Sequence, residues 1–232
     1  MSTAMKSVEP TPFIHALEEA LVAPRQRFMG SRLIQHVMGG TVTLPLYKAL
    51  LRETYHFVNR TPVHLRLAAA RMDSAGEEGQ LRERFLRHAK EESGHDLWAL
   101  RDLEALGEDI EAVKASDPLP FTAALIAYEH YTVTQQNPKS ILGLEFAMEG
   151  LTAKAGGAAV QAIQAKLGIP DNAVTFFLKH AQLDAHHVED DIKVISRFID
   201  SESDRKDVLR NAVDSTILYG AMYDGICDSV GL

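Results

Sequence analysis

The stretch 177–198, FLKHAQLDAHHVEDDIKVISRF, gives the strongest indication of the fold class of this 232-residue chain. Steps of three and four residues along it select Phe177, His180, Asp184, His187, Asp191, Val194 and Phe198. Because an α-helix turns by about 100° per residue, these positions share one face. The face is apolar at both ends and carries His-x3-Asp-x2-His in between. Burying each of these polar groups without a partner would cost roughly several kcal/mol, so the pattern predicts a core helix on which each of them has a partner or binds a metal.

A stretch further upstream repeats this design. Steps of four and three residues select Leu81, Phe85, His88, Glu92, His95 and Ala99. The polar centre is again a carboxylate with imidazoles, and Glu92 with His95 forms a Glu-x2-His pair. The downstream counterpart is Asp184 with His187. With this spacing one helix of a bundle presents an oxygen and a nitrogen ligand to a metal, so two such helices predict four ligands.

A di-iron carboxylate centre also needs a bridging carboxylate from another helix. The run 143–150, GLEFAMEG, offers Glu145 and Glu149, one helical turn apart. Imidazole and carboxylate without thiolate favour Fe, Mn or Zn over Cu(I) or an iron–sulfur cluster. The spacing alone leaves both glutamates open as ligands.

Composition and charge narrow the class of protein. The net charge of −8 argues against a nucleic-acid surface, where a basic stripe is expected. Cys227 is the one cysteine, which excludes an internal disulfide and is compatible with a reducing compartment. No apolar run approaches the roughly 18 residues of a membrane span, and the start, MSTAMKSVEPTPF, shows no targeting pattern. We therefore expect a cytoplasmic protein that acts on a small molecule.

Breaker residues divide the chain into about seven helices, with no strand of consequence. We expect residues 1–10 to be a disordered tail and residues 11–232 to form a single helical domain. The expected helices are 11–28, 44–72 with a kink or break at Pro62, 78–106, one from about 119 to 136, 140–167, 172–199, and one that follows 200–203 and runs to about 227. Gly150, Gly156 and Gly157 weaken the fifth helix by roughly 1 kcal/mol each relative to Ala, which indicates a bend or a close approach to a ligand.

The order of the candidate ligands resembles a known family. Glu-x2-His, a lone Glu about fifty residues later, and His-x3-Asp-x2-His about thirty residues after that are similar to the haem-oxygenase-like di-iron oxidases and oxygenases. That family includes the fatty-acid decarboxylase that makes terminal alkenes and the chlamydial death-domain-associated protein. The motifs that carry the resemblance span 88–191. It implies an all-α, haem-oxygenase-like bundle of about seven helices without haem.

The same resemblance implies an iron-dependent oxidoreductase, an oxidase or oxygenase that binds two Fe and uses O2 as co-substrate. Its substrate would be fatty-acid-like or amino-acid-like, and a homodimer stays open. The metal ligands carried over residue by residue are Glu92, His95, Glu149, His180, Asp184 and His187. Glu149 is preferred to Glu145 because its spacing to His180 looks like the commoner one in the family. Some members have a Glu where this chain has His88, which is therefore either a ligand or a residue that supports one.

Two other classes of function remain open. A metal-independent, thiaminase-like or quinone-cofactor-synthesis-like enzyme on the same bundle would use the histidines and carboxylates as acids and bases. A ferritin-like iron-binding protein would take a further carboxylate from Glu53. His-x3-Asp-x2-His favours the oxidase or oxygenase over the ferritin-like protein, because a ferritin-like helix usually needs only the Glu-x2-His part.

Overall fold

The computed structural model describes residues 11–232, except for the side chains of Ala155, Asp184, Ala185 and His186. Within this part of the chain every regular element is a helix, which confirms the all-α prediction. The predicted tail, residues 1–10, lies outside the described residues. None of the helices searched in the described part is long and apolar enough to cross a membrane.

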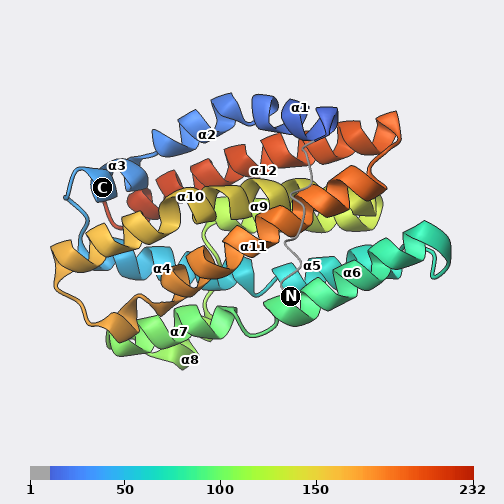
Figure 1. The fold of residues 1–232 in the computed structure, drawn as a ribbon. Coiled ribbons are helices and arrows are strands. Elements are labelled where there is room, and N and C mark those ends of the chain that lie inside the picture. The colour runs from blue at the N-terminus through green and yellow to red at the C-terminus, as the bar shows by residue number, and fades with distance from the viewer. Residues whose placement is uncertain (1–10) are drawn as a thin grey trace, which may run out of the picture.

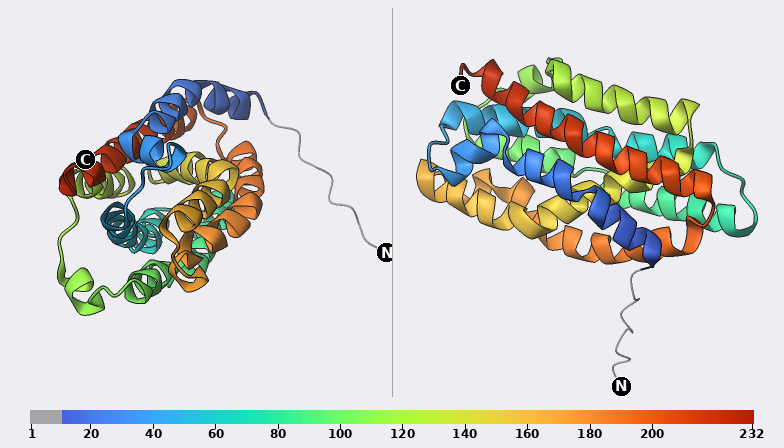
Figure 2. Two further views of the ribbon diagram at one scale, coloured as in Figure 1. Left: turned by 90° about the vertical axis from the view of Figure 1, so that its left-hand side faces the viewer. Right: turned by 90° about the horizontal axis from the view of Figure 1, so that it is seen from above.

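The helices run largely along one common axis (Figures 1 and 2). In chain order they are α1 (Pro12–Ala20), α2 (Val22–Met29), α3 (Arg32–Met38), α4 (Leu44–Val58), α5 (Thr61–Ala70), α6 (Gly76–Glu92), α7 (Asp96–Ala105), α8 (Ile110–Ala115), α9 (Pro120–Gln135), the 3-10 turn η1 (Pro138–Ser140), α10 (Ile141–Leu167), the 3-10 turn η2 (Asp171–Ala173), α11 (Thr175–Phe198) and α12 (Glu202–Ser229). Helix α10 packs between α11 and α12, and α12 also packs against α9. Helix α4 pairs with α7, and α5 with α6.

Two expected helices are interrupted away from the candidate ligands. The first is divided at Leu21, between α1 and α2. The second is divided at Asn59 and Arg60, so of the kink or break expected at Pro62 the structure shows a break, and Pro62 lies in the first turn of α5. The physical reason is that the fixed φ and missing N–H of proline are tolerated in a first turn and break a helix interior.

A third interruption matters more, because it divides the Glu92–His95 pair. The expected helix 78–106 ends at Glu92 and resumes at Asp96, and Gly94 between them has φ +97°. Glycine has no Cβ, so it adopts this left-handed conformation at little cost. Glu92 is therefore the last residue of α6 and His95 is the N-cap of α7. The prediction that one continuous helix presents both ligands was wrong.

Helix α10 runs unbroken through its glycines and approaches α12 closely at Gly143. A Cβ at this position would lie 2.2 Å from Val208 O and 2.7 Å from Ala212 N, so any other residue would force the two helices apart. This contact fixes the position of α10 along α12. It thereby also fixes where Glu145 and Glu149 lie relative to α11, the other neighbour of α10.

Candidate metal centre

Four helices bring the candidate ligands together. Helix α11 packs against α10, α7 and α6, each of which supplies candidate ligands. Asp102 of α7 caps the start of α11, because its carboxylate accepts from Thr175 N at 3.0 Å and from Phe176 N at 2.8 Å. Asp102 is fully buried, and this burial raises its pKa. The cap holds the first turns of α11 beside α7, so His180 lies next to His95, with ring centroids 4.9 Å apart.

Glu92, His95 and His180 form a first group of potential ligands, called here the His95 cluster. One ligand atom of each lies within 4.8 Å of the other two. His95 Nδ1 donates to Glu92 Oε2 at 3.2 Å, and both side chains are buried. Burial opposes ionisation of Glu92, but the hydrogen bond from His95 and the nearby imidazoles outweigh it and lower the pKa of Glu92. The cluster therefore holds an anionic oxygen ligand beside two imidazoles.

His180 is oriented for coordination by its own backbone. Its Nδ1 lies 3.3 Å from Phe176 O, so a proton on Nδ1 donates to this carbonyl and leaves Nε2 as the acceptor nitrogen. The Phe176 ring packs on the imidazole at 4.1 Å. Burial lowers the pKa of His180 to about 4. The imidazole is thus neutral at pH 7, which is the form that binds a metal.

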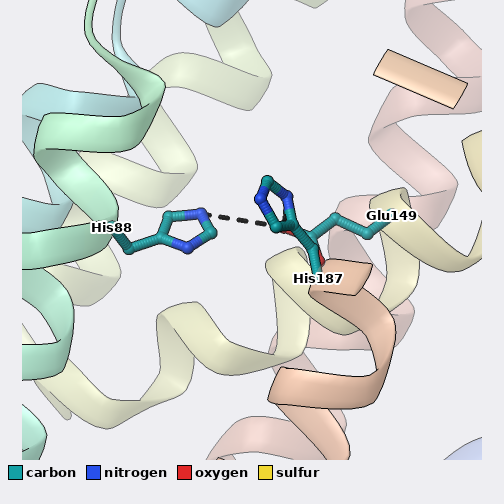
Figure 3. A group of neighbouring side chains, drawn as sticks. All are labelled: His88, Glu149 and His187. Carbon is teal, nitrogen blue, oxygen red and sulfur yellow. Dashed lines mark ion pairs between the residues drawn. The ribbon is translucent and has the colours of Figure 1, made fainter. Parts of the chain in front are cut away.

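His88, Glu149 and His187 form a second group, called here the His88 cluster. They come from α6, α10 and α11 and point toward one another (Figure 3). Glu149 Oε1 lies 3.7 Å from His88 Nε2 and 3.5 Å from His187 Nδ1. The two imidazole rings are 5.1 Å apart. Of the two roles left open for His88, the geometry favours that of a ligand.

The two clusters adjoin at Glu92. Its Oε2 faces His95 at 3.2 Å, and its Oε1 lies 3.9 Å from His88 Nε2 of the other cluster. A bridging carboxylate was expected from Glu145 or Glu149. The structure shows that Glu92 also has one oxygen directed to each cluster, which sequence spacing did not reveal.

Glu145 has a different partner. It pairs with Arg84, whose Nη2 also donates to Asp191 Oδ1 at 2.5 Å, and all three side chains are buried. Burial, and then the charge of Glu149, raise the pKa of Asp191 well above its usual range. Arg84 was not identified from the sequence, although its place one turn before His88 puts it on the same face of α6. Glu145 belongs to neither cluster among the described residues, and the side chain of Asp184 lies outside them.

The donor set and its geometry fit metal ions. Each cluster offers two imidazoles and one carboxylate, a set that suits iron. Ligand atoms about 2.1 Å from one ion lie at most about 4.2 Å apart, so a spacing within 4.8 Å needs only small side-chain shifts. A cavity of about 100 Å³ opens against both clusters, and its walls include His88, Glu92, Glu149 and His180. Its remaining walls are largely apolar, and include Phe57, Val58, Leu144, Met148, Phe176 and Phe177.

Comparisons with known proteins identify the family and the fold of the chain. The sequence profile of a family described as iron-containing redox enzyme matches residues 48–219. A domain of unknown function with a haem-oxygenase-like fold from Shewanella denitrificans is 26% identical, with a TM-score of 0.86 over 95% of this chain and 94% of that one. A TenA homologue from Pseudomonas syringae is 15% identical, with a TM-score of 0.80 over 100% and 98%. Haem oxygenase from Leptospira interrogans is 12% identical, with a TM-score of 0.69 over 92% and 99%. No curated protein matches the sequence. The predicted haem-oxygenase-like fold is confirmed.

Proposed function

Because the chain belongs to the haem-oxygenase-like family of iron-containing redox enzymes, we propose that it is a non-haem di-iron oxidase or oxygenase that uses O2 on a small organic substrate. The observation that carries the proposal is the pair of adjoining clusters that meet at Glu92. We assign one Fe to the His95 cluster and one to the His88 cluster. Asp184, which lies between His180 and His187 in the motif, is a further proposed ligand.

The bound irons would supply the electrons that reduce O2. The protein's own residues prepare the site for that chemistry. Phe176 O keeps the proton of His180 on Nδ1, so that Nε2 stays available to the metal. The apolar walls of the cavity offer water few hydrogen-bond partners beside the two clusters, which strengthens the electrostatic interactions there.

Arg84 supports the site from outside the clusters. It pairs with Glu145 one turn below Glu149 on α10 and with Asp191 one turn beyond His187 on α11. Its guanidinium charge offsets the buried carboxylates and ties α6 to both helices. Arg84 therefore fixes the spacing of the three helices that carry the His88 cluster.

The ferritin-like alternative depended on Glu53, which lies apart from both clusters. Its Oε2 accepts from Leu119 N at 2.9 Å, and it lines a separate groove beside α8. A hydrolytic enzyme of the thiaminase-like kind would use a carboxylate–imidazole pair as acid and base. Four imidazoles gathered in two adjoining clusters exceed that need and favour two metal ions.

Iron loading of single-residue variants tests the proposal. Anaerobic reconstitution with Fe(II) should give about two Fe per chain, since each cluster supplies one set of ligands. His95→Ala and His187→Ala should each lower the iron affinity of their own cluster by at least about tenfold. Removing a residue that only hydrogen-bonds to a metal ligand typically lowers metal affinity by that much, and removing a ligand should lower it at least as far. His15→Ala, an exposed histidine on α1, is the matched control. Unchanged iron content in both cluster variants would contradict the proposal.

A further inference from the structure

Trp98 connects the His95 cluster with the surface of the protein. Its ring stacks on the imidazole of His95, with centroids 4.2 Å apart and planes at 24°, and makes a T-shaped contact with His180 at 5.5 Å. His95 is buried, whereas Trp98 is partly exposed. Phe176, which packs on His180 at 4.1 Å, is itself buried. Ring contacts therefore lead from solvent through Trp98 to a proposed metal ligand.

This route is separate from the cavity at the clusters. Glu92 and His180 are among the residues that line the cavity. Neither His95 nor Trp98 is among the described residues of its walls. Trp98 lies instead on α7, one turn after the N-cap residue His95. It therefore gives access to the His95 cluster without occupying the space of a small-molecule substrate.

An oxygenase reaction at this site needs electrons from outside the chain. Insertion of one atom of O2 into a substrate, with release of the other as water, consumes two electrons that the substrate bond does not supply. The irons that supply them must be reduced again before the next cycle. Because electron tunnelling slows steeply with distance, a ring stacked on a metal ligand shortens the gap that an electron from the surface has to cross.

Lys179 determines how Trp98 can take part in such a transfer. Its Nζ lies 4.7 Å from the centroid of the Trp98 ring. The π electrons of the neutral ring attract this ammonium group. Removing an electron from the ring would place a second positive charge beside the first, and Coulomb repulsion opposes that step. Trp98 is therefore suited to pass an electron inward by tunnelling while its own ring stays neutral.

We propose that Trp98 is the relay through which a one-electron donor outside the cavity reduces the iron of the His95 cluster. Each transfer oxidises the donor by one electron and converts one Fe(III) to Fe(II), and no bond or proton changes at Trp98. The inference rests on the proposed function for the presence of iron. It adds the route by which the reducing electrons arrive.

A photosensitiser tethered beside Trp98 tests the relay. Arg101→Cys places a reactive thiol at an exposed position one turn along α7, and the native Cys227 is 0% exposed. A ruthenium polypyridyl complex attached there, with ascorbate as the electron source, becomes a one-electron reductant after a laser flash. The loss of Fe(III) absorption then gives the rate of reduction. Trp98→Leu should slow it severalfold, and Trp98→Phe, which keeps an aromatic ring, should retain much of it. An unchanged rate in Trp98→Leu would overturn the proposal.

A second label position serves if Trp98→Leu fails to bind iron. Arg197→Cys is exposed and lies about 25 Å along α11 from His180. Its label should reduce the iron more slowly than the label at Arg101→Cys, and Trp98→Phe should not change that rate. Equal rates from the two positions would refute the relay.

The iron content of each variant separates a relay from a structural role. Trp98→Phe should keep the iron content and the urea stability of the unsubstituted protein. A tryptophan radical detected during the inward transfer would refute the neutral-ring path. Absence of iron from the unsubstituted protein would instead refute the proposed function, whereas normal iron content with a rate independent of Trp98 refutes only the relay.

Discussion

Replacing Glu149 and Glu145 separately by Gln should affect two different properties, metal binding in the first variant and folding stability in the second. Both residues lie on the same helix, one turn apart, and each substitution removes one negative charge while it keeps the shape of the side chain. Glu149 Oε1 is within 3.7 Å of two imidazoles of the His88 cluster. Glu145 pairs with the buried Arg84. The first substitution therefore changes a proposed ligand, and the second changes a structural ion pair.

The magnitudes follow from these contacts. Losing the anionic ligand at Glu149 should lower iron affinity by at least about ten- to a hundredfold. Metal-free Glu149→Gln should lose less than about 1 kcal/mol of stability, because a neutral amide removes the repulsion with the buried Asp191. Glu145→Gln should cost roughly 1–3 kcal/mol, less than the roughly 3–5 kcal/mol of a fully broken buried pair, because the amide oxygen still accepts from Arg84 and Asp191 stays in place.

Two measurements on each variant separate the effects. Iron content and Fe(II) affinity report the cluster, and urea unfolding of the metal-free protein reports the ion pair. We expect Glu149→Gln to lose iron and keep its stability, and Glu145→Gln to do the reverse. If Glu145→Gln loses iron while Glu149→Gln keeps it, the bound carboxylate lies one turn upstream and the assignment of the His88 cluster is refuted.

Three further results are expected. Burial and nearby positive charge lower the pKa of His64 to about 4, so as the pH falls the unfolded chain takes up a proton that the folded chain does not. The free energy of unfolding should therefore fall by up to about 3 kcal/mol from pH 6.5 to pH 4. Urea unfolding at each pH measures this loss, which should be smaller in His64→Gln. Gly143→Ala should destabilise the fold by roughly 1–3 kcal/mol or more, whereas Gly220→Ala, whose Cβ would meet only ordinary contacts, should be neutral or stabilising in the same assay. Trp98, the only tryptophan, stacks on His95 at 4.2 Å, so Fe(II) or Co(II) at this cluster should quench its fluorescence, and unchanged emission at saturating metal would count against the site.

Periodicity predicted much of the fold and many of the proposed site residues. The stripe of α11 could be read from sequence because its apolar and polar positions keep helical spacing over the whole helix. Helical spacing also concealed the break at Gly94 between α6 and α7, because the residues on either side of this short interruption keep the spacing of one continuous helix. A single glycine in a polar run gives a weak signal until its φ is known.

Contacts between distant residues could not be predicted in the same way. Arg84 and Asp191 are 107 residues apart, and their pairing depends on how α6 and α11 are placed by the rest of the bundle. The cap that Asp102 gives to α11 spans 73 residues to Thr175 and is equally hidden. Both are features of helix packing, on which local spacing carries no information.

An anomalous difference map of crystals grown with Fe(II) under anaerobic conditions would locate the metal ions themselves. We expect two peaks at the iron absorption edge, one among Glu92, His95 and His180 and one among His88, Glu149 and His187. A map without a peak in either cluster, or with iron bound only elsewhere on the protein, would contradict the assignment of these clusters as a di-iron centre.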